Sequence, residues 1–234
     1  MTAPRHDGRN RAILALDTAT SRVVIAVGSI DGAPLGVSYR LAEHRHGDHL
    51  LPAIGRVMGE ANVRRSRVEA IVVGTGPGAF TGLRVGIATA KGVAHGLGRP
   101  LIGVATSEAL ISAAAAATGA APATILLLLP AGPSDRTVCR LGEPPRLLRA
   151  GTEPDVTPDD VLVAVDLDGR APADATARGA AALDGIGEQL LRLGAERFAA
   201  GGEDMLATLV PEYVTLPRGI TASSGEVAWS SDRR

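Results

Sequence analysis

Aromatic side chains are scarce in this 234-residue chain and make up only 2% of it. Two Phe, two Tyr and a single Trp, Trp229, cannot line the stacking platform that most single-strand nucleic-acid binders use. A core must therefore be filled with Val, Leu, Ile and Ala. The hydrophobic share of 45% is sufficient for one sizeable core or two small ones.

The chain also lacks an excess of either charge and a second cysteine. Lys and Arg number 24 against 25 Asp and Glu, so the formal net charge of −1 provides no overall attraction to phosphate backbones. Any nucleic acid would have to be held mainly by another protein. Cys139 alone cannot form an internal disulfide or a cysteine zinc cluster, which favours a reducing compartment and a role for Cys139 as a small hydrophobe.

Long hydrophobic runs are absent too. The longest aliphatic run, Ile125 to Leu129, is far too short to cross a bilayer. The stretch from Met1 to Arg11 is polar and has no apolar segment of signal-peptide length behind it. We therefore expect a soluble cytoplasmic protein without membrane contact.

Complete catalytic motifs are missing. The sequence has no Gly-x-Ser-x-Gly elbow, and neither His44 nor His46 is followed by a histidine four residues later, as a metal-binding helix requires. The glycine-rich stretch at 74–78 is not followed by the Lys-Ser/Thr pair of a Walker A loop, and Thr81 stands where a dinucleotide fingerprint has its last glycine. We expect no catalytic residue and no metal site.

The first half of the chain shows the alternation of strands and helices that is typical of an α/β lobe. We assign residues 1–107 to this lobe. The expected order is strands at 13–17, 23–27 and 35–40, a helix at 48–62, a strand at 68–73, a helix at 81–97 and a strand at 101–104.

The second half, residues 108–217, is predicted to form a smaller and divergent α/β lobe. The expected helices are at 108–118, 183–198 and 203–209, and the expected strands are at 124–129, 137–141, 146–149 and 161–166. Segments 142–158 and 170–178 are predicted to be surface loops, and the tail at 218–234 is predicted to be disordered.

An acidic residue at a strand end opens the most informative motif. Asp17 is followed by Thr18, Ala19 and Thr20 and by a returning strand. Sugar kinases, actin and the heat-shock ATPases open with such a loop, in which the hairpin backbone approaches nucleotide phosphates and the Asp organises a metal or water. Ala19 stands where those ATPases usually have Gly. Asp17 and Thr18 are therefore candidates for a vestigial phosphate loop, and the alternative is a tight hairpin capped by Asp17.

Two further loops could approach phosphate. A glycine loop between a strand and a helix, at 74–86, can bind phosphate at the helix N-terminus, but a rigid turn that positions the helix is the favoured interpretation. Residues Asp166 to Gly169 could form a second phosphate loop. Because Arg170, Ala171 and Pro172 replace its further glycines, a plain turn is favoured there.

The helix predicted at 81–97 carries two stripes of small residues at steps of four. Each interior glycine costs about 0.5 to 1 kcal/mol relative to alanine, so close packing against both stripes must offset the loss. We expect one stripe to face the chain's own sheet and the other to face another subunit. The alternative for the second stripe is the helix at 48–62 of the same chain. The stripes are Gly82, Gly86, Ala90 and Ala94, and Ala88, Gly92 and Gly96.

Four motifs together resemble the TsaB family in order and spacing. They are Asp17 to Thr20, then His46 followed by Leu50-Leu51-Pro52, then Gly76 to Gly86, and finally Pro100 to Val104. The nine residues from Gly76 to Arg84 are the most specific. The resemblance is strong over 13–110 and afterwards rests on Val161 to Gly169 and Pro211 to Tyr213.

The resemblance implies an α/β, actin-like fold of the sugar kinase, heat-shock ATPase and ribonuclease H type, with two lobes of which the second is reduced. It implies a non-catalytic scaffold or activator in the formation of N6-threonylcarbamoyladenosine in tRNA, with the transferase TsaD as heterodimer partner and the ATPase TsaE as third member. It implies no cofactor of its own and leaves open ATP or ADP at the interface with TsaD. A small-molecule kinase or ATPase that uses Asp17 is the alternative.

The resemblance also implies that helices of the first lobe form the surface that pairs with TsaD, or with a second copy of the chain when TsaD is absent. tRNA would be contacted through the complex only. The expected interface residues are Leu50, Ile54, Val57, Met58, Arg84, Ala88, Lys91, Gly92 and His95.

One segment departs from the family pattern. After the strand at 125–129 the family usually has Asp-Ala-Arg and then Glu-Val-Tyr, whereas this chain has Pro130-Ala131-Gly132 and then Arg136 to Cys139. No family role is therefore carried over to this segment.

Overall fold

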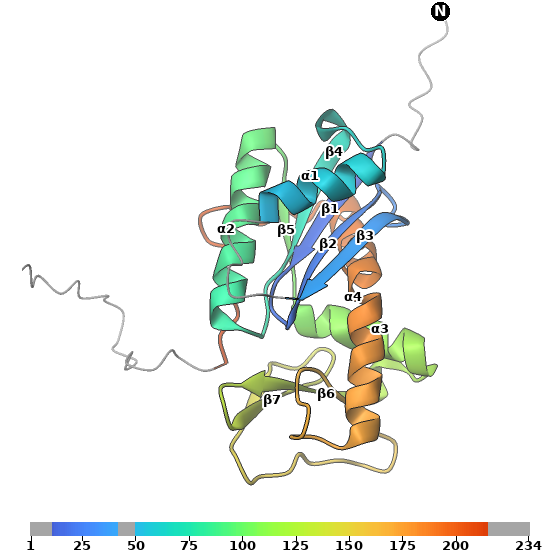
Figure 1. The fold of residues 1–234 in the computed structure, drawn as a ribbon, viewed down its shortest axis with the longest axis vertical. Helices are drawn as coiled ribbons and strands as arrows, with labels where there is room; N and C mark the ends of the chain where they lie inside the picture. The colour runs from blue at the N-terminus through green and yellow to red at the C-terminus, as the bar shows by residue number, and fades with distance from the viewer. Residues whose placement is uncertain (1–10, 42–49, 215–234) are drawn as a thin grey trace, which may run out of the picture.

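The structure is a computed structural model, and it describes residues 11–41 and 50–214. Its larger sheet has the strand order β3-β2-β1-β4-β5 (Figure 1). β1 to β3 form an antiparallel meander, and β4 and β5 continue the sheet in parallel to β1. The bounds are β1 Ala12–Asp17, β2 Arg22–Ser29, β3 Pro34–Leu41, β4 Val68–Gly74 and β5 Leu101–Val104.

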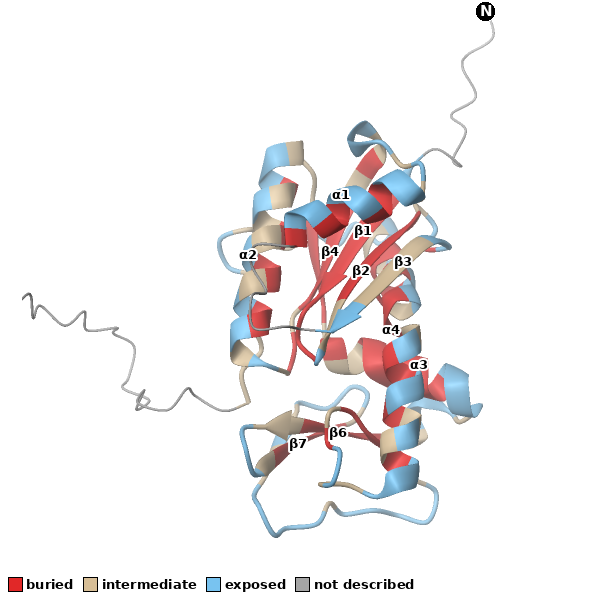
Figure 2. Ribbon diagram, in the orientation of Figure 1, coloured by how far each residue is buried: buried red, intermediate tan, exposed pale blue. Residues whose placement is uncertain are grey.

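Helices cover both faces of this sheet. Every residue of β1 is buried, which explains its continuous apolar sequence. Alternate residues of β1 point to opposite layers: Leu14 packs with α1 (Leu50–Glu60) and α2 (Phe80–Leu97), and Ala15 packs with α3 (Thr106–Thr118) and α4 (Ala173–Ala199). Figure 2 shows the buried stripe that each helix turns inward.

The smaller sheet has the order β8-β7-β6-β9. β6 to β8 are antiparallel, and β9 runs parallel to β6. The bounds are β6 Ile125–Ala131, β7 Asp135–Cys139, β8 Arg146–Leu148 and β9 Val161–Ala164. Two sheets of five and four strands confirm the predicted α/β fold with a reduced second lobe.

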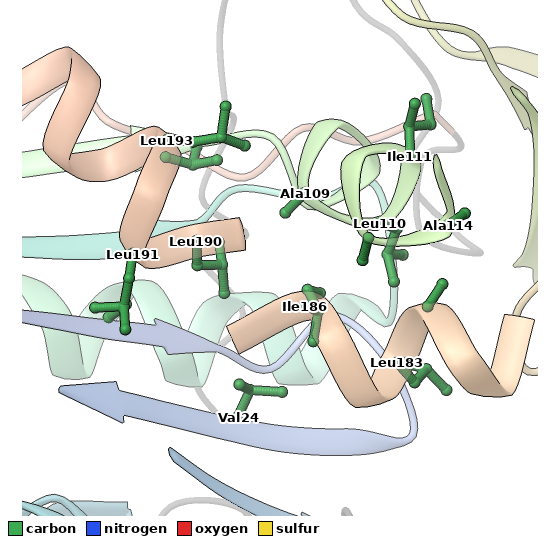
Figure 3. Close-up of a cluster of buried hydrophobic side chains, with 14 of the residues drawn as sticks. Val24, Ala109, Leu110, Ile111, Ala114, Leu183, Ile186, Leu190, Leu191 and Leu193 are labelled. Atoms are coloured by element: carbon green, nitrogen blue, oxygen red, sulfur yellow. The ribbon is translucent and has the colours of Figure 1, made fainter. Parts of the chain in front are cut away.

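A single hydrophobic cluster joins the two lobes through α3 and α4. Ile186 and Leu190 of α4 belong to the same cluster as Val24 of the larger sheet and Leu127 of the smaller one. Figure 3 shows the α4 residues of this cluster beside α3 and the meander. One helix, α4, therefore contributes to the cores beside both sheets.

The predicted strands are all present, but two predictions in the second half are wrong. α4 begins at Ala173, so most of 170–178 is helix and not loop. The sequence did not predict this because the buried side of the first turns consists of small residues such as Ala175 and Gly179, which give a weak hydrophobic pattern. Residues 203–209 are not helical. Asp204 forms a bridge to Leu101 and turns follow it, so this segment extends along the edge of the larger sheet.

Several expectations lie outside the described residues, namely the three histidines His44, His46 and His49 and the tail at 218–234. Within the described part, no helix has both the length and the apolar composition needed to cross a membrane. Cys139 is buried in β7, and burial raises the pKa of its thiol to about 12. It therefore packs as a small apolar residue.

We predict that Gly194→Ala destabilises the chain by about 1 to 3 kcal/mol. A Cβ at Gly194 would lie 2.3 Å from a methyl carbon of Val72, because α4 crosses the larger sheet at this point. Urea unfolding measures the loss. Gly96→Ala is the control, since nothing lies within 4 Å of a Cβ there. Equal stability of the two variants would show that α4 does not pack as described.

Candidate functional site

Asp17 is completely buried at the end of β1, and both its carboxylate oxygens are used inside the chain. Oδ1 accepts a hydrogen bond from the backbone N–H of Ala19 at 2.8 Å, and Oδ2 accepts one from the hydroxyl of Thr106 at 2.6 Å. Thr106 in turn accepts the N–H of Gly76 at 3.0 Å. Asp17 therefore caps the hairpin and joins it to the glycine loop and to α3.

Three glycines, at the end of β4, in the loop after it and in the first turn of α2, each make room for one part of this hairpin. A Cβ at Gly74 would lie 1.7 Å from Oδ2 of Asp17, and one at Gly78 would lie 2.3 Å from the carbonyl oxygen of Ala19. A Cβ at Gly82 would lie 2.0 Å from the carbonyl oxygen of Thr18. Backbones approach so closely here that any side chain would collide.

Gly86 completes this contact, because a Cβ there would lie 2.1 Å from Oγ1 of Thr18. That hydroxyl donates a hydrogen bond to the carbonyl of Gly82 at 2.7 Å, and the N–H of Ala79 donates to Ala19 at 2.7 Å. The first small-residue stripe of α2 thus packs against its own chain. The space beside Asp17 and Thr18, the candidates for phosphate binding, is filled by the chain's own glycine loop.

The hairpin is also tied to the second lobe. The N–H of Ser21 donates to Oδ2 of Asp166 at 2.7 Å, and the Ser21 hydroxyl donates to the other carboxylate oxygen. Asp166 adopts a left-handed backbone with a φ of 55° in the turn after β9. Two of the three loops that the sequence indicated as phosphate candidates, the hairpin after Asp17 and the turn that begins at Asp166, are therefore hydrogen-bonded to each other.

The end of the described chain holds the other side of the glycine loop. The N–H of Glu212 donates to the carbonyl of Thr75 at 2.8 Å. Tyr213 stacks on Phe80 with ring centroids 5.0 Å apart and accepts a hydrogen bond from Arg84 at 3.0 Å. This gives a structural role to the Pro211 to Tyr213 segment that resembled the family.

A groove of about 750 Å³ lies between α1 and α2. The second small-residue stripe of α2, Ala88, Gly92 and Gly96, lines it, and nothing lies within 4 Å of a Cβ at Gly92 or Gly96. The helix α1 of the same chain therefore flanks this stripe without filling it. The α1 residues that line the groove are Leu51, Ile54, Gly55 and Met58.

The structure separates the expected partner residues into two groups. Leu50 and Val57 are buried against the larger sheet, and Ile54 and Met58 are buried but line the groove. The α2 residues are exposed or, for Lys91, half-buried: Arg84, Ala88, Lys91, Gly92 and His95. The α2 set lies together on the outer face of one helix, and its role in partner binding stays a prediction.

Sequence reasoning missed two groove residues on α1, Leu51 and Gly55. Leu51 is 60% exposed although it is large and apolar. Gly55 and Gly59 follow it at steps of four, and nothing lies within 4 Å of a Cβ at either. Two interior glycines in an 11-residue helix are a signal of close approach like that in α2.

Comparisons with known proteins agree with this fold. The family model described as "TsaD: tRNA N6-adenosine threonylcarbamoyltransferase" matches residues 21–142. A solved structure titled "YeaZ from Pseudomonas aeruginosa" superposes with a TM-score of 0.68 and 24% identity, covering 87% of this chain and 99% of that chain. This likeness shows the shared fold.

Two curated relatives have sequences similar to part of the chain. The Escherichia coli tRNA threonylcarbamoyladenosine biosynthesis protein TsaB is 36% identical over 94 residues, which are 40% of each protein. The protein of the same name from Haemophilus influenzae is 34% identical over 106 residues, which are 45% of this chain and 44% of the relative. Each match spans less than half of the relative's own length.

The fold and the site thus define a class: a two-lobed α/β protein in which glycines at 74–86 pack tightly against the first hairpin. The chain belongs to the TsaD family of tRNA N6-adenosine threonylcarbamoyltransferases, because that family model matches more than half of its residues. Within it, the resemblance to TsaB that the motifs indicated is confirmed by named relatives.

Burial raises the pKa of the Asp17 carboxyl from its ordinary value of 3.8 to about 6, against the opposing hydrogen bonds from Thr106 and Ala19. The folded chain then holds this proton more tightly than the unfolded chain. Stability from Asp17 is therefore lost as the pH rises from about 4 to about 6.

We predict that Asp17→Asn removes this pH dependence. The wild-type chain should lose about 3 kcal/mol relative to the variant between about pH 4 and pH 7. Urea unfolding at both pH values measures the difference, with exposed Asp168→Asn as the control. A difference that stays constant with pH would contradict the assignment.

Proposed function

We propose that the chain is a non-catalytic subunit in the formation of N6-threonylcarbamoyladenosine in tRNA, and that it pairs with TsaD through the groove between α1 and α2. The observation that carries the proposal is the open second stripe of α2. Gly92 and Gly96 leave space that no described side chain of the chain occupies. Similarity to TsaB relatives supports the same process.

The two stripes of α2 differ in what offsets the cost of their glycines. The hairpin packs against Gly82 and Gly86 so closely that a Cβ added at either position would lie about 2 Å from an oxygen atom of Thr18. Gly92 and Gly96 have no such neighbour, and Gly55 on α1 has none either. Helices pack at interaxial distances of about 8 to 10 Å, and small residues allow the closest approach. A partner helix laid into the groove would supply the missing contact.

A non-catalytic role is supported by the state of Asp17. A kinase or ATPase of this fold needs that carboxylate to reach a bound metal or a water molecule. Here both oxygens accept hydrogen bonds from the chain itself, and the residue has no exposed surface. The transfer chemistry would then belong to TsaD. TsaE would be the third member, and ATP or ADP would bind only where TsaD contributes.

We predict that Gly92→Leu abolishes pairing with TsaD while the chain stays folded. The leucine would fill the groove that the partner helix needs, but it would meet no atom of its own chain at its Cβ. Gly92→Ala should raise the stability of the isolated chain by about 0.5 to 1 kcal/mol, because alanine favours the helix. Circular dichroism melting and size-exclusion chromatography with TsaD measure the two effects.

Two variants control for this experiment. Gly86→Leu should lower the melting temperature instead, because the new side chain meets Thr18. Ala180→Leu places the same bulk on an exposed position of α4 and should leave pairing unchanged. Full complex formation by Gly92→Leu would refute the assignment of the groove.

tRNA binding gives a separate test. The near-neutral chain has few aromatic residues, so the isolated protein should bind tRNA more weakly than about 1 μM at physiological salt. Filter binding or fluorescence anisotropy with and without TsaD measures the contribution of the complex. Submicromolar binding by the chain alone would contradict the scaffold role.

A further inference from the structure

The outer edge of the larger sheet is covered by the chain segment that follows α4. β5 is the last strand of this sheet, and Leu101 and Gly103 are residues whose backbone groups face its outer edge. Residues 203–213, which we call the strap, run from this edge to the loop after β4 (Figure 1). The edge of a sheet is a template for an extended chain, and here the strap takes that place.

Asp204 is the first anchor of the strap. Its backbone N–H donates to the carbonyl of Leu101 at 2.8 Å, and its Oδ2 accepts the N–H of Gly103 at 2.6 Å. Arg197 of α4 donates to the carbonyl of Gly103 and to Glu108. Both outward backbone groups of Gly103 are therefore bonded to charged side chains. Among side-chain acceptors, a carboxylate makes the strongest bond of this kind.

Leu209 is the second anchor. Together with Leu206 it packs against the buried cluster on the α1 and α2 side of the larger sheet. A Cβ at Gly103 would lie 2.8 Å from Cδ1 of Leu209, so the absence of a side chain in β5 lets the strap lie against the edge. A glycine inside a strand weakens it and often marks such a close approach.

The far end of the strap is held at the loop after β4. The N–H of Glu212 donates to the carbonyl of Thr75 at 2.8 Å, and the ring of Tyr213 lies 5.0 Å from that of Phe80, centroid to centroid. Tyr213 is therefore the third anchor. The site thus contacts an acidic, an aliphatic and an aromatic side chain in that order along the strap.

The strap is attached more loosely than the strands beside it. Every residue of 203–213 is half-buried or exposed, and Met205 and Val210 are 68% and 66% exposed. Beyond the bridge at Asp204 its backbone forms turns and irregular structure. Segments with few buried contacts and exposed backbone open locally without unfolding the rest of a protein. We therefore expect the strap to leave the edge as a unit.

We propose that the β5 edge and the loop after β4 form a peptide-binding site, which the strap occupies as a built-in and displaceable ligand. The ligand class is an extended segment of another protein with an acidic residue, an aliphatic residue five positions later and a tyrosine four positions after that. Such a segment binds along β5 and releases the strap. None of the three strap anchors lines the groove between α1 and α2, so the inference does not depend on the proposed function.

Tethering explains why the strap holds the site in the free chain. α4 ends at Ala199, and Asp204 contacts the edge five residues later. A short connection gives an effective concentration on the order of millimolar, which a free peptide at micromolar concentration does not overcome. A competitor therefore binds when the strap is loosened or when the competitor's own protein is held beside the chain.

The first test offers the strap sequence as a separate peptide. A labelled peptide of residues 203–214 should bind the full-length double variant Asp204→Ala, Leu209→Ala at least about tenfold more tightly than the wild-type chain, because the weakened strap competes less. Fluorescence anisotropy measures the binding, and circular dichroism shows whether the variant is folded. A folded variant that binds the peptide no better than the wild type would overturn the proposal.

Two controls change the same segment. The double variant Met205→Ala, Val210→Ala alters exposed strap residues, so it should bind the peptide as weakly as the wild-type chain does. A peptide that carries Asp204→Ala and Leu209→Ala should not bind the loosened variant. Equally tight binding of this peptide would show that the anchors are not recognised, and the assigned ligand class would then be wrong.

The second test uses the wild-type chain and needs no variant to fold. If the strap opens locally, the amide of Gly103 should exchange with deuterated water at least about tenfold faster than the amide of Val72 in the adjacent strand β4, as measured by NMR. Equal exchange rates would mean that the strap leaves only when the whole chain unfolds. The edge would then never be free for a competitor, and the proposal would fail.

A second copy of the chain is the other source of a strap, and sedimentation velocity tests it. Dimers of the wild-type chain that Asp204→Ala, Leu209→Ala abolishes and Met205→Ala, Val210→Ala retains would identify the strap of a second copy as the ligand. That result would overturn the assignment to another protein. Each of these outcomes leaves the proposed function untouched, because binding of TsaD by the Gly92→Leu variant decides it separately.

Discussion

The close contact between the hairpin at 17–19 and the glycines that follow β4 is the constraint on which the rest of the structure depends. Four glycines, at 74, 78, 82 and 86, lie so near to this hairpin that a Cβ at any of them would collide with it. The contact fixes the start of α2 against β1 and fills the space beside Asp17. It therefore orients the helix that carries the proposed partner face.

Two linked consequences follow for function. Asp17 becomes a buried structural residue whose hydrogen bonds, from Ala19 and Thr106, hold the hairpin to its neighbours. The glycines of the outer stripe remain open and line the groove between α1 and α2. The two stripes can make different contacts because successive stripes of a helix face different layers.

The lobes are coupled more closely than their separate sheets suggest. α4 packs its first half on the smaller sheet and its second half on the larger one, and Ser21 binds Asp166 across the two. Small residues such as Gly179 and Gly194 let α4 lie directly on both sheets. A rigid connection of this kind suits a protein that presents a surface, since it leaves the hairpin little freedom to open.

The sequence by itself determined the strands along the chain and the helix α2, because continuous apolar runs and turn residues are local properties. It failed for the start of α4, whose buried side is alanine and glycine, and for 203–209, where a bridge from Asp204 to Leu101 is followed by turns. Only the tertiary structure decided which stripe of α2 faces its own hairpin and which lies open, and that Leu50 and Val57 are core residues. Those outcomes depend on contacts between residues far apart in the chain, which spacing along one helix does not encode.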